Sequence, residues 1–132
     1  MSEQNVEVVR RVFMAWQAGA IEQLDGLLSP EVEWRPTPLS DAGAEVFTGL
    51  PGVHDWSSTV VSRHGEVRNE IAEMRDLGDR VLVLGRVVET IGTEVRTDAE
   101  LAWLFELREG RITRGEGFLS KDEAYRAAGL IG

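Results

Sequence analysis

The 132-residue sequence contains no cysteine, which excludes disulfides, thiolate metal sites and a cysteine nucleophile. It also lacks any apolar run near the roughly 18 residues that a helix needs to cross a bilayer. Its first residues, MSEQNVEVVRR, lack the basic start and apolar core of a signal peptide. We therefore expect a cytoplasmic protein with no membrane partner.

Basic side chains are scarce: 14 lysines and arginines stand against 23 acids, for a formal net charge of −9. This charge repels phosphate backbones, and no basic run offsets it, so nucleic acid is not an expected partner. No metal and no cofactor are expected either. The apolar fraction of 42% and the charged fraction of 28% are typical of a globular protein, and the length fits a single domain over residues 1–132.

Helical spacing dominates the first half of the chain. Apolar residues recur at three- and four-residue steps over residues 6–20 and again over 21–28, which predicts two helices. Val32 and Trp34 then alternate with charged residues, as in a short strand. Residues 36–52 hold three prolines and three glycines and are expected to form a loop over the surface or over a cavity mouth.

After a third helix-compatible segment at residues 53–63, the pattern changes to strands. Four strand-like runs follow, at residues 66–77, 80–91, 94–107 and 111–119. The turns between them, such as the one at Gly92-Thr93, leave no room for crossover helices, which predicts an antiparallel meander. A short helix at residues 121–128 closes the chain. The fold class is therefore α+β, with helices on one face of a curved sheet.

Three stretches carry a family resemblance: VRRVFMAWQAGAIEQLDGLL near the start, PEVEWRP before the loop, and LFELREGRI followed by EGFLSKDEAYRAAGL at the end. With the order of elements, they resemble the SnoaL-like branch of the nuclear transport factor 2 superfamily over nearly the whole chain. The resemblance implies a cone in which N-terminal helices and a strongly curved antiparallel sheet enclose a pocket. It also implies a homodimer formed through the convex sheet face. Function does not follow, because the superfamily holds isomerases, cyclases, dehydratases, epoxide hydrolases and many non-enzymes.

The concave, helix-covered face of the sheet is then the place to look for a site. Side chains alternate along strands, so one register assigns every residue to a face. With a turn at Gly92-Thr93, Trp103 is expected opposite Leu82, and a one-residue slip would exchange the faces on one strand. The concave set is apolar with one arginine: Leu82, Leu84, Arg86, Val88, Leu101, Trp103, Phe105 and Leu107. The convex set mixes small, apolar and charged residues: Val83, Gly85, Val87, Glu100, Ala102, Leu104 and Glu106.

The reactive positions of catalytic relatives hold no proton-transfer group in this sequence. Similarity to ketosteroid isomerase places the base of that enzyme at Trp34 and its second acid at Trp103. Similarity to limonene epoxide hydrolase retains the arginine at Arg86 but places the two aspartates at Val88 and Gly117. The acid/base of SnoaL-type polyketide cyclases also falls at Gly117. An arginine alone has no proton to give near neutral pH.

Two candidates for acid/base chemistry remain. By alternation Glu116 points to the convex face, where it would pair with an arginine, but Gly115 and Gly117 on either side of it often mark bulges that redirect a side chain. His54 lies near the predicted loop and is either an acid/base or a surface or capping residue. Arg86 must be paired if it is buried, either by a ligand oxygen or by an internal acid or carbonyl.

The four tryptophans come from four separate elements: Trp16, Trp34, Trp56 and Trp103. All of them could simply fill the core, but the resemblance places Trp34 and Trp103 at reactive positions and so favours a pocket-lining role for both. Aromatic walls with a single cation suit a flat hydrophobic ligand with a negative or carbonyl oxygen. Arg86, Trp34 and Trp103 are the expected anchors, with Trp56 and His54 near the entrance. The same two indoles could instead plug the cavity.

Three functions stay open. The first is a small-molecule pocket for a hydrophobic, aromatic or polyketide-like ligand, without acid/base chemistry. The second is a cyclase, isomerase or hydratase that uses Glu116 or His54 as acid/base and Arg86 as oxyanion partner. The third is a dimerising structural module with a filled core. The predicted pocket lining comprises Trp34, Trp56, Arg86, Val88, Leu101, Trp103, Phe105, Gly115 and Gly117.

Overall fold

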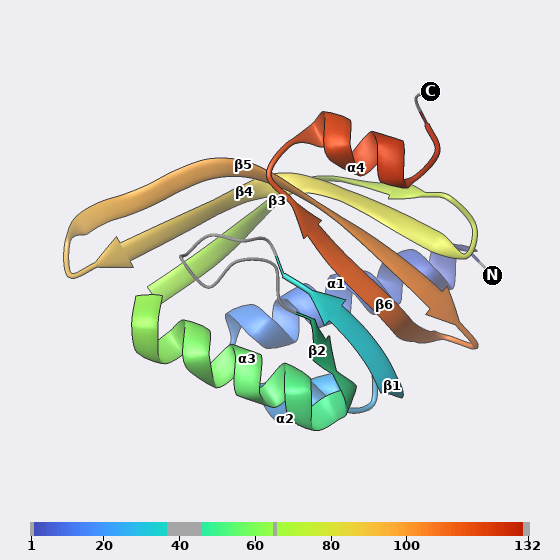
Figure 1. The fold of residues 1–132 in the computed structure, drawn as a ribbon, viewed down its shortest axis with the longest axis horizontal. Helices are drawn as coiled ribbons and strands as arrows, with labels where there is room; N and C mark the ends of the chain where they lie inside the picture. Colours follow the sequence, from blue (N-terminus) through green and yellow to red (C-terminus); the bar gives the residue numbers. More distant parts are fainter. Residues whose placement is uncertain (1, 37–45, 65, 131–132) are drawn as a thin grey trace.

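The computed structural model describes residues 2–36, 46–64 and 66–130. Within these residues, six strands form one curved sheet in the order β2-β1-β6-β5-β4-β3 (Figure 1). The elements are α1 (Ser2–Gln17), α2 (Ile21–Leu24), β1 (Leu28–Arg35), β2 (Phe47–Thr48), α3 (Gly49–His64), β3 (Glu66–Asp76), β4 (Arg80–Ile91), β5 (Glu94–Arg108), β6 (Arg111–Phe118) and α4 (Lys121–Ala127). The predicted α+β class is confirmed. No helix in the described ranges has the length and apolar character required to cross a bilayer.

The predicted meander is confirmed, since β3, β4, β5 and β6 are antiparallel neighbours. The first strand differs from the others, because β1 pairs with β6 in parallel and with the short β2 in antiparallel orientation. β1 therefore joins the free side of β6 and extends the sheet around the helices. This placement brings Trp34 beside the last strand of the meander.

The second helix is shorter than predicted. It ends at Leu24, and β1 already begins at Leu28, where the chain is held against β6 by a hydrogen bond from the Ile112 N–H to the Leu27 carbonyl (3.0 Å). Pro30 lies inside β1, but at a point where the pairing with β6 is interrupted. A proline is tolerated there because no ladder hydrogen bond needs its missing N–H.

The loop predicted for residues 36–52 is also shorter than expected. Phe47–Thr48 forms β2, and α3 begins at Gly49 rather than at residue 53. Residues 37–45 of that predicted loop lie outside the described residues. The early start of α3 places Val53 and Trp56 on its second turn, facing β1.

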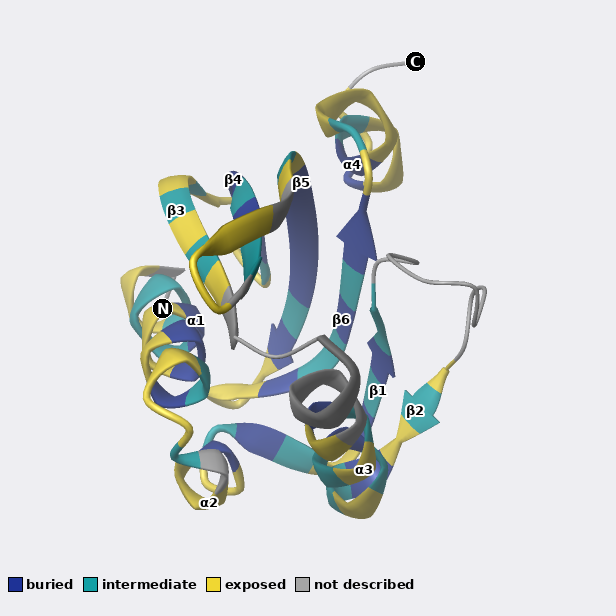
Figure 2. Cartoon of the chain, turned by 90° about the vertical axis from the view of Figure 1, so that its left-hand side faces the viewer, coloured by how far each residue is buried: buried dark blue, intermediate teal, exposed yellow. Residues whose placement is uncertain are grey.

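The helices cover both faces of the sheet, which corrects the prediction that they share one face. Helices α1, α2 and α3 lie on the inner face, whereas α4 lies on the outer face (Figure 1 and Figure 2). Ser120 caps α4 by accepting a hydrogen bond from the Glu123 N–H (3.2 Å), as expected for a serine at this position. The main core lies on the inner side, and a second core lies under α4 and contains Leu82, Leu84, Ala102, Leu104, Phe118 and Ala124.

The predicted register of β4 against β5 is wrong by one residue. Beside the turn the pairing agrees with the expectation, with Thr90 opposite Val95. Residue 96 is then an unpaired extra residue in β5, and beyond this bulge Val83 pairs with Trp103. A bulge of one residue exchanges the two faces of the partner strand. The inner face of the sheet therefore carries Val81, Val83, Val87, Leu101, Trp103, Phe105 and Leu107, and only the β5 half of the prediction is confirmed.

A second bulge bends the other edge of the sheet. Ile71 pairs with Gly85 and Glu73 with Leu84, so Ala72 is the extra residue of β3. The bulge brings the backbone of β3 so close to β4 that a Cβ atom on Gly85 would overlap the Glu70 carbonyl oxygen. Only glycine fits at such a close approach of two backbones.

Candidate functional site

An apolar cavity of about 40 Å³ lies between the inner face of the sheet and helices α1, α2 and α3. The described residues of its wall are Val12, Trp16, Leu24, Leu28, Val32, Trp34, Val53, Trp56, Phe105, Ile112 and Gly115. None of these residues is ionisable. A protein cavity that holds benzene measures about 150 Å³, so this cavity is smaller than an aromatic ring requires.

Three indoles form one corner of the cavity wall. The ring centroids of Trp34 and Trp56 are 5.2 Å apart at 72°, and those of Trp16 and Trp34 are 6.3 Å apart at 90°. The ring centroids of Trp16 and Trp56 are 4.6 Å apart. Trp34 is buried, whereas Trp16 and Trp56 are only partly buried. Among the described residues of the wall, Trp16 and Trp56 are therefore the two that are not fully buried.

Gly115 provides the space in which the Trp34 ring lies. It pairs with Trp34 on one side and with Phe105 on the other. A Cβ atom at this position would lie 2.8 Å from Cε3 of Trp34 and 3.0 Å from Cε1 of Phe105. The two rings are almost parallel, at 4° and 6.2 Å between centroids. The glycine therefore fixes how deeply the indole of Trp34 enters the core.

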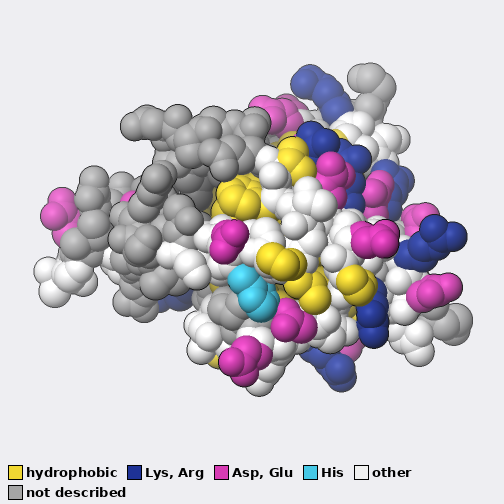
Figure 3. Space-filling model, turned by 60° about the horizontal axis from the view of Figure 1, so that its bottom comes forward, with side chains coloured by type: hydrophobic (Ala, Val, Ile, Leu, Met, Phe, Trp, Pro, Cys, Tyr) yellow, Lys and Arg dark blue, Asp and Glu magenta, His cyan; other side chains and the backbone are white. Residues whose placement is uncertain are grey.

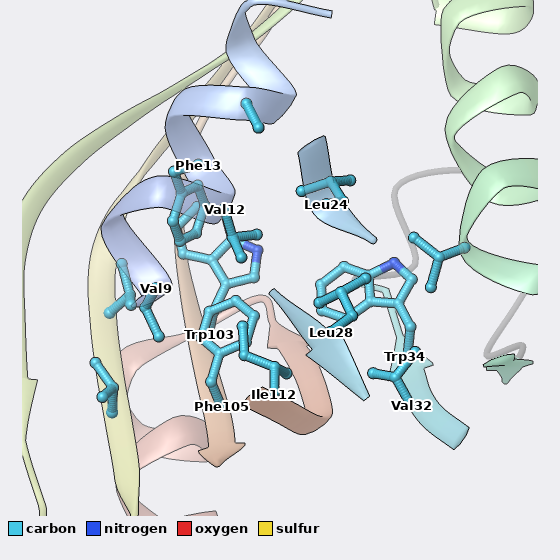
Figure 4. Packing of buried hydrophobic residues seen from close by; sticks show 14 of the residues in the cluster. Val9, Val12, Phe13, Leu24, Leu28, Val32, Trp34, Trp103, Phe105 and Ile112 are labelled. Atoms are coloured by element: carbon cyan, nitrogen blue, oxygen red, sulfur yellow. The ribbon is translucent and has the colours of Figure 1, made fainter. Parts of the chain in front are cut away.

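Trp103 lies in the core and is not part of the cavity wall. It is 2% exposed and packs edge-on against Phe13, at 5.2 Å and 72°. Figure 4 shows Phe13 and Trp103 together on one side of Phe105, with Trp34 on the other side. Leu101 is likewise buried in the main core, and Gly117 pairs with Trp103 across β5 and β6.

Arg86 lies on the outer face of the sheet, away from the cavity. Its Nε and Nη2 atoms donate hydrogen bonds to Oδ1 of Asp98, at 2.9 and 2.6 Å. The two side chains are 44% and 50% exposed, and the hydrogen bond to Asp98 raises the pKa of Arg86 above its usual value. Val88 follows two residues later on the same strand face. The bulge at residue 96 is the physical reason why both residues face outward.

We expect Arg86→Ala to leave both the melting temperature and the binding of any ligand in the cavity almost unchanged. An ion pair this exposed contributes little to stability, and it does not contact the cavity wall. Thermal unfolding and ligand titration of the variant measure the two effects, with Asp98→Ala as the matched control for the other partner. A loss of affinity of about tenfold, the size of a lost charged contact, would assign Arg86 to the site after all.

Glu116 also points to the outer face. Its Oε1 atom lies 3.4 Å from Nη2 of Arg114, whose Nε lies 3.7 Å from Glu33. Arg35 adds a further contact to Glu33 at 3.1 Å, so the four side chains form a surface network of alternating charge. Glycines on either side of Glu116 do not turn it inward, because Leu104 and Arg35 are its neighbours across both strand pairs.

His54 lies at the surface where α3 meets the end of α2. Its Nε2 atom is 2.8 Å from Oδ1 of Asp25, and the two side chains are 39% and 44% exposed. The face that carries α2 and α3 shows a histidine among acidic side chains, beside a small group of apolar ones (Figure 3). His54 is not part of the cavity wall. Among the described residues, no three His, Asp or Glu side chains come together as a possible metal site.

Three side-chain polar atoms are buried without a hydrogen-bond partner in the described part of the chain: Trp34 Nε1, Arg35 Nε and Ser57 Oγ. The burial of Ser57 could have been predicted from helical spacing, because Ser57 lies four residues after Val53 and so shares its buried face. Whether such a group finds a partner depends on the tertiary structure.

A comparison with protein families matches residues 9–115 to the model of the SnoaL-like domain. The chain belongs to the SnoaL-like family. This match confirms the resemblance seen in the sequence. None of the curated proteins matches the chain.

Solved structures extend the likeness to nearly the whole SnoaL-like domain. Bal32a, from a soil-derived mobile gene cassette, has a TM-score of 0.80 and 23% identity, with 94% of this chain and 95% of that chain covered. TerC, co-crystallised with polyporic acid, has a TM-score of 0.79 and 21% identity, with 93% and 96% covered. A protein with a ketosteroid isomerase-like fold from Catenulispora acidiphila, in complex with trimethylamine, has a TM-score of 0.74 and 19% identity, with 95% and 94% covered. At these identities the likeness concerns the fold alone.

Of the predicted lining of this SnoaL-like domain, four residues are brought together at the cavity: Trp34, Trp56, Phe105 and Gly115. Leu101, Trp103 and Gly117 lie deeper in the core or sheet, and Arg86 and Val88 lie on the outer face. The predicted cation of the site is therefore absent from the cavity wall, and the aromatic part of the prediction is present.

Proposed function

We propose that this SnoaL-like domain binds a small hydrophobic molecule, of aromatic or polyketide-like character, in the tryptophan-lined cavity, and that it supplies no acid or base to that molecule. The observation that carries the proposal is the composition of the wall, in which no described residue is ionisable and three indoles meet. Aromatic walls around a concave apolar site are typical of small-molecule pockets.

The cavity has to open to admit such a ligand. About 40 Å³ holds no ring compound, so a ligand enters only if part of the wall moves. Trp16 and Trp56 are the residues to move, because both are only partly buried. TerC co-crystallised with polyporic acid and the Catenulispora acidiphila protein in complex with trimethylamine support the idea that this fold accepts small organic molecules.

The outward position of Arg86 changes the expected charge of the ligand. The sequence suggested an anionic or carbonyl group because of that arginine. Without a cation among the described residues of the wall, an anion would be buried unpaired, which is very costly. The net charge of −9 also disfavours anions at long range. A neutral ligand is therefore the best match to this cavity.

Calorimetric titration with the neutral aromatic probe 2-naphthol tests the proposal. We expect saturable binding to the wild type and a loss of at least about tenfold in affinity in Val53→Phe, which fills the cavity from α3. Val95→Phe is the matched control, because Val95 is 58% exposed and is not part of the wall. Circular dichroism of each variant establishes that the fold is retained.

Two results would contradict the proposal. Absence of binding by the wild type, or equal binding by Val53→Phe, would favour the structural module with a filled core. That second candidate is supported by the small volume of the cavity. The enzymatic alternative depended on Glu116, His54 and Arg86, which lie outside the cavity wall. The homodimer through the convex face and the cytoplasmic location stay predictions.

A further inference from the structure

The Trp34 indole is the fixed part of the cavity wall. On the side of β6 it lies directly against Gly115, where an added Cβ atom would be only 2.8 Å from Cε3 and 2.9 Å from Cζ3 of the indole. The ring of Phe105 lies parallel to it, with the two centroids 6.2 Å apart. Trp34 is 7% exposed, and a ring packed this closely has no space to turn into. A molecule that enters the cavity therefore has to bind against this ring without displacing it.

The ring of Trp56 packs against two other indoles of the wall. Its centroid is 5.2 Å from that of Trp34 and 4.6 Å from that of Trp16. Trp16 and Trp34 also contact each other, at 6.3 Å and 90°. Aromatic rings attract one another at centroid distances of about 4.5–7 Å. Trp16 and Trp34 therefore hold the indole of Trp56 in the way in which they would hold an aromatic ligand.

Trp16 is anchored more firmly than Trp56. The ring of Trp16 also stacks on Phe13, at 6.3 Å and 30°, and Phe13 is 4% exposed and belongs to the main core. In the described part of the chain, the aromatic partners of Trp56 are Trp16 and Trp34 alone. Trp56 is also only partly buried. Its ring can therefore turn toward solvent while Trp16 stays stacked on Phe13.

The space that the Trp56 ring fills decides which ligands fit. The cavity measures about 40 Å³, whereas a cavity that holds benzene measures about 150 Å³. An indole is a bicyclic ring and is larger than benzene. Departure of the Trp56 ring would therefore leave room for a compound of one or two rings beside Trp16 and Trp34.

We infer that Trp56 is the internal occupant of the ligand site: its indole fills the position that the ring of the ligand takes against Trp16 and Trp34, and it turns toward solvent when the ligand binds. This inference rests on the proposed function and adds the residue that sets the size and the affinity of the ligand. A ligand exchanges the contacts of Trp56 for its own, so the apparent affinity of the wild type is reduced by the fraction of molecules in which Trp56 is in place.

Replacement of the Trp56 ring by free indole tests the inference. We expect Trp56→Ala to bind indole and 2-naphthol at least about tenfold more tightly than the wild type does in calorimetric titration, which is the effect of removing two competing aromatic contacts. Trp56→Phe keeps a smaller ring in the site and should bind both probes with intermediate affinity. Leu50→Ala is the matched control on α3, because Leu50 is partly buried against the main core and is not among the described residues of the wall. Circular dichroism of each variant establishes that the fold is retained.

The wild type provides a second measurement, which does not depend on the folding of Trp56→Ala. Nuclear Overhauser contacts between the ring protons of Trp34 and Trp56 are followed by NMR during titration with 2-naphthol, and the signals are assigned from their loss in Trp34→Phe and Trp56→Phe. At saturation we expect the contacts between these two rings to disappear. Contacts from 2-naphthol to both Trp16 and Trp34 should replace them.

Saturation of the wild type by 2-naphthol with the contacts between Trp34 and Trp56 intact would overturn the inference while the proposed function stands. The same conclusion would follow if a folded Trp56→Ala bound indole no more tightly than the wild type. Binding of 2-naphthol by Trp56→Ala but not by the wild type would overturn the proposed function and the displacement of Trp56, because the ring would then be a permanent part of the core. Binding by neither protein would overturn both.

Discussion

Gly85→Ala is expected to lower the free energy of unfolding by about 3 kcal/mol. The added Cβ would overlap the Glu70 carbonyl oxygen, and that oxygen belongs to the backbone of β3, so it cannot rotate away as a side chain could. Relief would require the bulge at Ala72 to move and the pairing of β3 with β4 to shift. Chemical denaturation followed by circular dichroism measures the loss.

Gly26→Ala is the matched control for this change. No atom lies within 4 Å of a Cβ built at Gly26, and its φ angle is outside the left-handed range. We expect that variant to remain within about 0.5 kcal/mol of the wild type. Equal effects of the two substitutions would mean that β3 adapts to the extra methyl group, and the close approach at Gly85 would not be a constraint on the sheet.

Trp103→Ala is expected to cost about 4 kcal/mol, the usual magnitude for truncating a buried tryptophan. The side chain is 2% exposed and packs on Phe13, so its loss leaves a void between α1 and β5. Denaturant titration measures the change. Trp103→Phe should keep much of the stability, because a smaller aromatic ring still contacts Phe13.

The same variants separate stability from ligand binding. Trp103→Phe should bind 2-naphthol as the wild type does, because Trp103 is not part of the cavity wall. A small stability loss in Trp103→Ala, below about 1 kcal/mol, would contradict its assignment to the core. Loss of 2-naphthol binding in a folded Trp103→Phe would return this tryptophan to the ligand site, where the sequence had placed it.

Much of the architecture follows from the sequence because it depends on local patterns. Helical spacing, strand alternation and glycine turns locate α1, α3, the four strands of the meander and α4 to within a few residues. The parallel pairing of β1 with β6 has no such local signal, since it depends on where the chain returns after two helices.

Local patterns do not predict which residues of β4 face the inner side of the sheet. The turn at Gly92-Thr93 predicted the correct pairing for Thr90 and Val95, and the bulge at residue 96 then reversed it. Both faces of β4 are apolar near Leu82 and Val83, so hydrophobicity does not reveal the reversal. The position of α4 follows from it, because the outward-facing Leu82 and Leu84 need a cover.

The predicted residues of the candidate site lie at the cavity only where the face of their strand was assigned correctly. Trp34 and Phe105 lie on strands whose faces were assigned correctly, and both are in the cavity wall. Arg86 lies on the strand whose face was reversed. The unpaired Trp34 N–H and Ser57 hydroxyl could not be predicted, because the absence of a partner is a property of the packed structure.

The cluster of Trp16, Trp34 and Trp56 also contributes to the optical spectra of the protein. With centroids 4.6 to 6.3 Å apart, the three indoles are close enough to exchange excitation energy and to couple their electronic transitions. Their emission will therefore report on the cluster as a unit, and their coupled transitions will contribute to circular dichroism. Any molecule that separates Trp16 from Trp56 will alter that coupling. Opening of the cavity can therefore be followed by tryptophan fluorescence or circular dichroism without an added label.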